Sequence, residues 1–198
     1  MSIRKYALTP VLMATVTLPL PLAADDDHAH QPSAGYREHG AHVHGVGDLN
    51  IVLEGSTLLI ELHGPAANIL GFEHPPTDAA ETQAVNDARA KLADPLQTFL
   101  PNAEADCELA AVEVFMELAG DEPGHSHAHD HDHGHAGETH SDAGAAYSFE
   151  CASPRALKAV HARLFEQFPG TERLRVQLIT PAGQRGAELT ADAPTLSL

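Results

Sequence analysis

One acidic stretch of the sequence contains seven of the fifteen histidines, and its chemistry is that of a metal binder. The segment "PGHSHAHDHDHGHAGETHSD" spans residues 123–142, and between residues 121 and 142 there are six carboxylates and no lysine or arginine. Imidazole nitrogen with an occasional carboxylate suits Zn²⁺, Cu²⁺, Ni²⁺ and Co²⁺. The candidate metal ligands here are His125, His127, His129, His131, His133, His135 and His140.

The composition of residues 121–142 predicts a disordered loop, because a segment without large apolar side chains cannot bury a core. A structural zinc site uses four fixed ligands, whereas seven histidines on a flexible chain allow many interchangeable ligand sets. We therefore expect the loop to capture or buffer metal with fast exchange, and any tighter site to lie on the folded domain. A solvated linker is the alternative, but linkers use Gly, Ser or charged residues rather than histidine.

A second group of histidines lies in "REHGAHVHGVGDLN", directly before the first predicted strand, and comprises His39, His42 and His44. Residues i and i+2 of an extended chain share a face, so His42 and His44 could bind one ion if the glycines nearby allow a bend. An exposed, weakly structured arm explains this segment equally well. His74 in "FEHPPTD", with a carboxylate beside it in a turn made rigid by prolines, is a further candidate.

The N-terminus has the layout of a secretory signal peptide over residues 1–24. Arg4 and Lys5 precede the apolar run "ALTPVLMATVTLPLPLA", and an acidic stretch follows Ala24. A retained membrane anchor is the weaker reading, because the run is short for a span and three prolines interrupt it. We therefore expect an exported protein with no membrane insertion after cleavage, a flexible arm over residues 25–40 and a metal-binding domain over residues 41–198.

Cleavage would leave nine cationic and 28 acidic side chains, a net charge near −19 with neutral histidine. Such a surface repels nucleic acid and anionic lipid and attracts cations. Enzyme signatures are missing from the sequence: there is no HExxH, no GxSxG and no glycine-rich phosphate loop. We expect a binding protein rather than an enzyme.

The two cysteines, Cys107 and Cys151, are expected to form a disulfide, since an exported protein meets an oxidising environment. They begin and end the segments that flank the histidine loop, so an antiparallel strand pair would place the two sulfurs side by side. Thiolate metal ligands are the alternative, but neither cysteine has a CxxC or CxxH neighbour.

The remaining chain predicts strands and two helices without parallel βαβ order. Hairpins are expected over residues 48–63, with a turn at Gly55-Ser56, and over residues 172–190. Helical spacing predicts one helix from Thr77 to Ala93 and a second that opens with Ser153 and Pro154 and runs to Phe168. The sequence therefore predicts a single α+β domain with a mainly antiparallel sheet, two main helices and the long histidine-rich loop inserted between two strands.

Two histidines outside these groups have simpler explanations than metal binding. His63 should lie opposite Asp48 in the first hairpin and pair with it. His161 falls on the apolar stripe of the second predicted helix, where a lone histidine is more often a satisfied residue at the border of the core.

Several separated segments together resemble the ZrgA-type periplasmic zinc-binding proteins. These are "HGAHVHGVGDLNIVLEG", "GFEHPPTD", the histidine-rich insertion flanked by cysteines, "FPGTERLRVQLITPAGQRGAELT" and "APTLSL". The resemblance implies zinc binding in the periplasm of a Gram-negative bacterium, in support of zinc uptake through an ABC-type transport system. It assigns no verified ligand set.

Ligand chemistry alone leaves a second function open. Raw affinity at imidazole sites favours copper over zinc, so the choice of zinc depends on metal supply and on the resemblance. The alternative is a periplasmic protein that sequesters excess copper, nickel or zinc for metal resistance and has no transporter partner.

Overall fold

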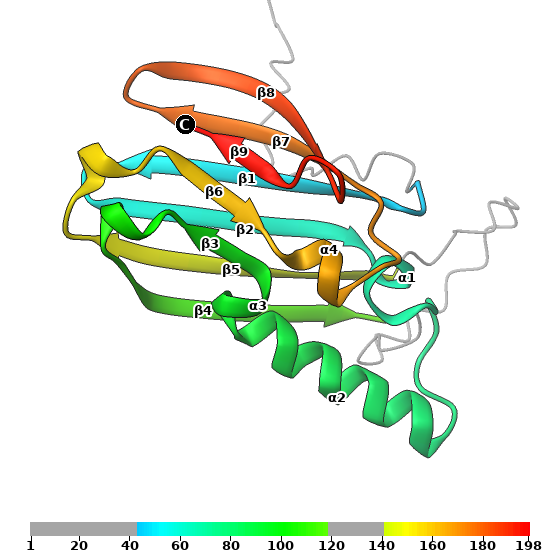
Figure 1. Cartoon of the computed structure of the whole chain (residues 1–198). Coiled ribbons are helices and arrows are strands. Elements are labelled where there is room, and N and C mark those ends of the chain that lie inside the picture. Colours follow the sequence, from blue (N-terminus) through cyan, green and yellow to red (C-terminus); the bar gives the residue numbers. More distant parts are fainter. Residues whose placement is uncertain (1–42, 119–140) are drawn as a thin grey trace, which may run out of the picture. The chain divides into compact units, whose positions relative to one another are not determined.

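The computed structural model describes residues 43–118 and 141–198, and the fold below is that of these residues (Figure 1). The expected signal peptide, the N-terminal arm and residues 119–140 of the predicted loop lie outside the described residues. Within the described part, no helix has the length and apolar character needed to cross a membrane.

The principal element is a six-stranded sheet with the strand order β4-β5-β2-β1-β7-β8 (Figure 1). Its strands are β1 (Val46–Glu54), β2 (Thr57–Pro65), β4 (Cys107–Glu117), β5 (Asp142–Cys151), β7 (Arg173–Thr180) and β8 (Gly183–Thr190). Every neighbouring pair is antiparallel except β1 and β7, which are parallel. The predicted α+β fold with a mainly antiparallel sheet is confirmed.

Both predicted hairpins are present, and the reason is the alternation of apolar and polar residues along their strands. In the first hairpin Glu54 lies opposite Thr57, and Gly55 adopts the left-handed conformation that the turn requires, with φ of 61°. The second hairpin joins β7 to β8 at Thr180 and Gly183.

One face of the large sheet, the inner face, forms the core. Alternate residues of β1, β2, β5 and β7 point to this face and are buried, among them Leu49, Ile51, Leu58, Ile60, Ala145, Tyr147, Leu174 and Leu178. The outer strands β4 and β8 contribute Met116 and Leu189. They pack against helix α2 (Ala79–Ala93) and a three-stranded sheet of β3 (Phe99–Pro101), β6 (Ala159–Ala162) and β9 (Thr195–Ser197). The Tyr147 hydroxyl donates a 2.6 Å hydrogen bond to the carbonyl of Leu92 at the end of α2.

Helix α2 confirms the first predicted helix, but the second prediction is wrong. Instead of one helix to Phe168, the chain forms the 3-10 helix η2 (Pro154–Ala156), strand β6 and the short helix α4 (Leu164–Gln167). Strand β6 pairs with β3 on one side and β9 on the other. Backbone pairing with two segments distant in sequence therefore overrides the local helical pattern.

Three further short helices connect the larger elements. They are α1 (Ala66–Leu70), α3 (Pro95–Thr98) and the 3-10 helix η1 (Ala103–Ala105).

The predicted disulfide is present and joins the two strands that flank the loop. Cys107 at the start of β4 lies opposite Cys151 at the end of β5, and their sulfurs are bonded. The bond closes a segment with a sequence separation of 44. The two cysteines are therefore not thiolate metal ligands.

Candidate metal centre

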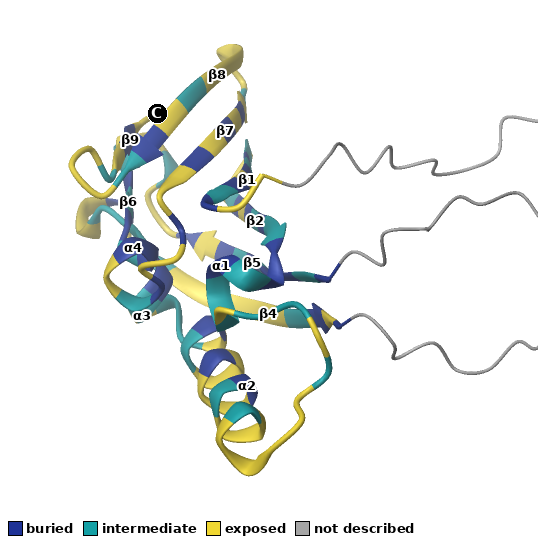
Figure 2. Ribbon diagram, turned by 90° about the vertical axis from the view of Figure 1, so that its right-hand side faces the viewer, coloured by how far each residue is buried: buried dark blue, intermediate teal, exposed yellow. Residues whose placement is uncertain are grey.

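The start of β1, the end of β2, the end of β4 and the start of β5 lie at one end of the large sheet, and the loop that carries His74 lies beside them. We call this region the histidine end; it comprises residues 43–46, 63–66, 72–74, 117–118 and 141–142. Pro65 at the end of β2 pairs with Asp142 at the start of β5, and Asp142 pairs with Glu117 at the end of β4. Strand β1 begins here as well, so the described chain leaves off at Val43, Leu118 and Ser141 on this same side (Figure 2). The fold thus brings the base of the histidine-rich segment next to His44 and His74.

The turn that carries His44 is held by a buried side chain. The amide of Val46 donates to the carbonyl of Val43 at 3.0 Å, and Gly45 completes the turn with φ of 84°. Asn68, which is 4% exposed, accepts from the Gly45 amide at 2.7 Å and donates to the Val46 carbonyl at 3.0 Å. Buried polar groups of this kind are nearly always hydrogen-bonded, and here both bonds of the Asn68 amide fix the backbone directly after His44.

His44 and Glu73 form a pair of candidate metal donors. Their Nε2 and Oε1 atoms are 3.1 Å apart, with His44 about two-thirds and Glu73 one-third exposed. Two donors on one tetrahedral zinc ion, each about 2.0 Å from the metal, lie about 3.3 Å from each other. The observed 3.1 Å is the length of a hydrogen bond from Nε2 to the carboxylate, which can only accept. The same spacing would suit two ligands of a single ion once Nε2 has given up that hydrogen.

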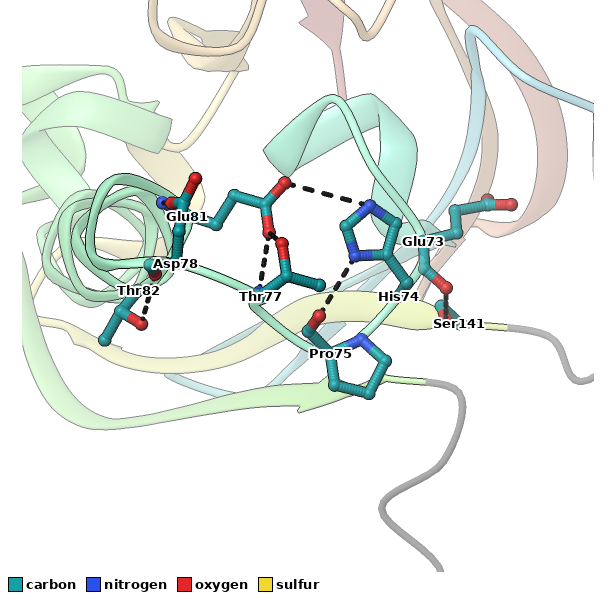
Figure 3. A network of polar contacts seen from close by, with 8 residues as sticks. All are labelled: Glu73, His74, Pro75, Thr77, Asp78, Glu81, Thr82 and Ser141. Atoms are coloured by element: carbon teal, nitrogen blue, oxygen red, sulfur yellow. Dashed lines mark hydrogen bonds and ion pairs between the residues drawn. The ribbon is translucent and has the colours of Figure 1, made fainter.

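The backbone of Glu73 is tied to the strand that follows the loop. The Ser141 hydroxyl donates to the Glu73 carbonyl at 2.6 Å, and the Ser141 carbonyl accepts from the Ala66 amide at 2.8 Å (Figure 3). Ser141 is completely buried. Two of the four buried polar side chains in the described residues, Asn68 and Ser141, thus hold the backbone segments that carry His44 and Glu73.

His74 is oriented as a metal ligand by its own neighbourhood (Figure 3). Its Nδ1 atom is 3.0 Å from the carbonyl of Pro75, which can only accept, so Nδ1 carries the hydrogen and the neutral ring has its lone pair on Nε2. Metal-binding histidines are commonly held in this way by a backbone carbonyl. The ring also stacks on Phe72, with centroids 5.0 Å apart.

Glu81 lies opposite the Nε2 atom of His74, with Oε1 at 3.8 Å (Figure 3). Its other oxygen accepts hydrogen bonds from the amide of Thr77 at 2.7 Å and from the Thr77 hydroxyl at 2.8 Å. These hydrogen bonds hold the pKa of Glu81 below its usual value. The carboxylate is therefore kept ionised, which is the form that binds a cation.

Glu81 was not predicted from the sequence as a site residue, although a signal for its position exists. Asp78 is the N-cap of α2, and its side chain accepts from the Glu81 amide at 2.9 Å. The spacing of Asp78 and Glu81 is that of a capping box, which directs the Glu81 side chain back toward the residues before the helix.

The two donor pairs do not combine into one centre. Glu73 and His74 are neighbours in the chain, but Figure 3 shows their side chains on opposite sides of the backbone. Among residues 43–118 and 141–198 no three His, Cys, Asp or Glu side chains are grouped closely enough to hold a metal ion. Each pair therefore supplies two donors, and further donors must come from elsewhere.

The remaining predicted ligands lie outside the described residues, and their roles stay predictions. These are His39, His42, His125, His127, His129, His131, His133, His135 and His140.

The contact expected for His63 is wrong, whereas its position is correct. His63 lies opposite Asp48 in the hairpin, but its Nε2 atom pairs with Oε1 of Glu61 at 3.0 Å. Asp48 instead accepts from Arg175 of β7 at 2.8 Å. His161 lies on strand β6, where its Nδ1 atom is 2.9 Å from the Thr195 hydroxyl, so it is satisfied by a neighbour as expected.

A comparison with protein families gives one match, over residues 41–198, to the family model described as "ZrgA family zinc uptake protein". No curated protein matches the chain. The matched range includes His42, His44, His74, the histidine-rich segment and both cysteines.

Proposed function

The chain belongs to the ZrgA family of zinc uptake proteins, and on this premise we propose that it captures Zn²⁺ in the periplasm and supports its uptake by an ABC-type transport system. Zinc is the cargo of such a protein rather than a catalytic cofactor, and we propose no enzymatic activity. Export would follow from the expected signal peptide over residues 1–24.

The observation that carries the proposal is the His44–Glu73 pair at the histidine end. A donor pair that is already at 3.1 Å and held by buried Asn68 and Ser141 loses little conformational entropy when it binds an ion. Flexible histidines lose more, so their sites are weaker and exchange faster. We propose that His44, Glu73 and His42 contribute to a tighter site, and that residues 121–142 supply several weaker ones.

The His74–Glu81 pair would act as an additional weak site on the folded domain. Its separation of 3.8 Å requires a small side-chain movement before both groups could bind one ion. The orientation of the His74 ring by Pro75 supports the assignment, because Nε2 faces the carboxylate with its lone pair available. Cu²⁺, Ni²⁺ and Co²⁺ would bind the same donors in vitro.

The charge of the protein supports capture of cations. With 28 acidic and 11 basic side chains, the formal net charge is −17. A surface of one sign raises the local concentration of oppositely charged ions and speeds their association.

Uptake and resistance are separated by measurements in cells. We expect a strain that lacks the protein to grow poorly and to contain less zinc when a chelator limits zinc. The wild-type gene should restore growth and zinc content, whereas a gene for the His44→Ala, Glu73→Gln variant should restore them only in part. Sensitivity of the deletion strain to excess copper, nickel or zinc, with normal growth under zinc limitation, would instead support the sequestering function.

A further inference from the structure

The face of the large sheet opposite the core, which we call the outer face, carries its own pattern of side chains. Strand register places residues of five strands in rows that cross the sheet. One row consists of Ala111, Ser148, Leu59, Val52 and Ile179, which are successive cross-strand neighbours. We call this row the apolar stripe. With strands about 4.8 Å apart, it extends about 19 Å across β4, β5, β2, β1 and β7.

The apolar stripe is accessible to a partner. Leu59 is 45% and Ile179 is 41% exposed, and they are two of six large apolar side chains in the described residues with such exposure. A hollow of about 500 Å³ lies along the stripe and the row next to it. The hollow forms because β5, which lies between β4 and β2, contributes only the small side chains of Ala146 and Ser148 here, while β2 contributes the larger Leu59 and Glu61.

Carboxylates border the apolar stripe on both sides. Glu113 and Glu61 occupy the row on the side of the histidine end, and Glu150 and Glu54 occupy the row on the other side. Among the paired strand residues that the structure describes, neither of these two rows contains a lysine or arginine. This part of the outer face is thus an apolar strip between two acidic rims, and the nearest cation toward the histidine end, Arg175 one row farther on, is paired with Asp48.

We propose that the outer face is a docking site for a polypeptide segment whose apolar side chains are flanked on both sides by lysine or arginine. The apolar side chains would cover Leu59, Val52 and Ile179, and the cations would meet Glu61 and Glu113 on one side and Glu54 and Glu150 on the other. Complementary charge of this kind fixes orientation and accelerates association.

The two acidic rims also decide which occupant the face does not fit. A second copy of this chain would bring rims of the same sign together, and juxtaposed like charges disfavour a complex. Phosphates of nucleic acid or lipid would meet the same repulsion.

A partner on this face would lie close to the histidine end. From Ser148 to Asp142 along β5 is six residues, or about 20 Å. The row beyond Glu61 contains Phe115 and His63, whose rings contact each other with centroids 4.7 Å apart, and the ion pair of Asp48 and Arg175. The site would therefore hold a partner within reach of the edge that carries His44.

The test uses the mature full-length chain and two labelled synthetic amphipathic peptides, one of Leu and Lys and one of Leu and Glu, in fluorescence anisotropy at about 0.15 M salt. We expect Leu59→Gln to weaken binding of the Leu/Lys peptide at least about tenfold. The double variant Glu54→Lys, Glu113→Lys should weaken it at least as much and should bind the Leu/Glu peptide instead. The control Asp87→Lys, Asp192→Lys makes the same change in net charge on α2 and between β8 and β9, and should leave both affinities close to wild type.

Other outcomes overturn the proposal. Equal losses in the rim and control double variants would show attraction by net charge alone, and unchanged binding in folded Leu59→Gln would exclude the apolar stripe. Dimerisation of the wild type in sedimentation, abolished by Leu59→Gln, would assign the face to a second copy. If Leu59→Gln fails to fold, the rim variant still tests the proposal through its change of peptide preference. Glu54 and Glu113 are exposed, so their replacement leaves the core intact.

Discussion

At the scale of single residues, His44 presents Nε2 to Glu73 from a turn that is fixed on both sides by Asn68. The pair joins two segments separated by 29 residues. It supplies two donors at a spacing suited to one zinc ion, whereas flexible histidines would have to be ordered on binding. The affinity of the tighter site should therefore depend on these two side chains.

We predict that His44→Ala or Glu73→Gln weakens the tightest zinc site by at least about tenfold, since even the loss of residues that only support ligands costs 10- to 100-fold in metal affinity. Competition titration with a zinc chelator measures the change. His161→Ala is the matched control, because this histidine is bonded to Thr195 and should leave the affinity unaltered. An equal loss of zinc affinity in all three variants would show that His44 and Glu73 contribute no more to the site than His161.

The sequence indicated some of these residues and could not indicate others. His44 was predicted from its spacing to His42, and His74 from the adjacent carboxylate and the prolines that follow it. The contact of His44 with Glu73 is made by folding, so no local pattern reveals it. The pairing of His63 with Asp48 failed because Arg175, 127 residues from Asp48, arrives on the neighbouring strand and binds the carboxylate.

At the scale of elements, helix α2 begins with Asp78 as its N-cap and with Glu81 bonded to Thr77. A carboxyl group whose pKa is lowered on folding stabilises the folded state above its unfolded pKa. That contribution is lost as the pH falls through the folded pKa. The start of α2 should therefore weaken on acidification below the usual glutamate value of 4.5.

We predict that Glu81→Gln lowers the free energy of unfolding at neutral pH and that the difference from wild type shrinks as the pH falls below about 4.5. Urea unfolding at a series of pH values, with a chelator present to exclude metal effects, measures both quantities. Glu188→Gln, on strand β8, serves as a control for loss of one exposed carboxylate. A difference between Glu81→Gln and wild type that stays constant down to pH 3, well below the glutamate reference, would contradict this account.

The disulfide between β4 and β5 should matter for stability and not for metal capture. Closing a segment of this length lowers the conformational entropy of the unfolded chain, which stabilises the folded state by up to about 4 kcal/mol. We predict that Cys107→Ala, Cys151→Ala lowers the melting temperature while the number of weak zinc sites stays the same. Calorimetry and zinc titration of the same sample test both parts, and two free thiols in unfolded, oxidised wild type would show that the bond does not form.

Sequence patterns identified burial more reliably than conformation. In the segment from Ser153 to Phe168, Leu157, Val160 and Leu164 are buried as the apolar spacing predicted. Their backbone is not one helix, because β6 completes a sheet between β3 and β9. The hairpins and α2 were predictable because their partners are close in sequence or their caps are local.

At the scale of the whole molecule, the fold places the described residues that border its histidine segments at one end. The first described residue, Val43, and the two residues that border the histidine-rich segment, Leu118 and Ser141, lie at the histidine end (Figure 2). The formal net charge of −17 attracts cations to the protein. On the function proposed above, abundant weak ligands would collect zinc and a fixed donor pair would retain it.

The most direct test of this account is a calorimetric zinc titration of the mature chain and of a variant in which a short Gly/Ser linker replaces residues 121–140. The replacement stops short of Leu118 and Ser141, since both side chains are buried and the Ser141 hydroxyl bonds to the Glu73 carbonyl. The folded domain should therefore stay intact. We predict that the variant loses most of the weak sites and keeps at least one tight site, which disappears on the further change His44→Ala. Complete loss of zinc binding in the linker variant, with the fold intact, would contradict the existence of a site on the folded domain.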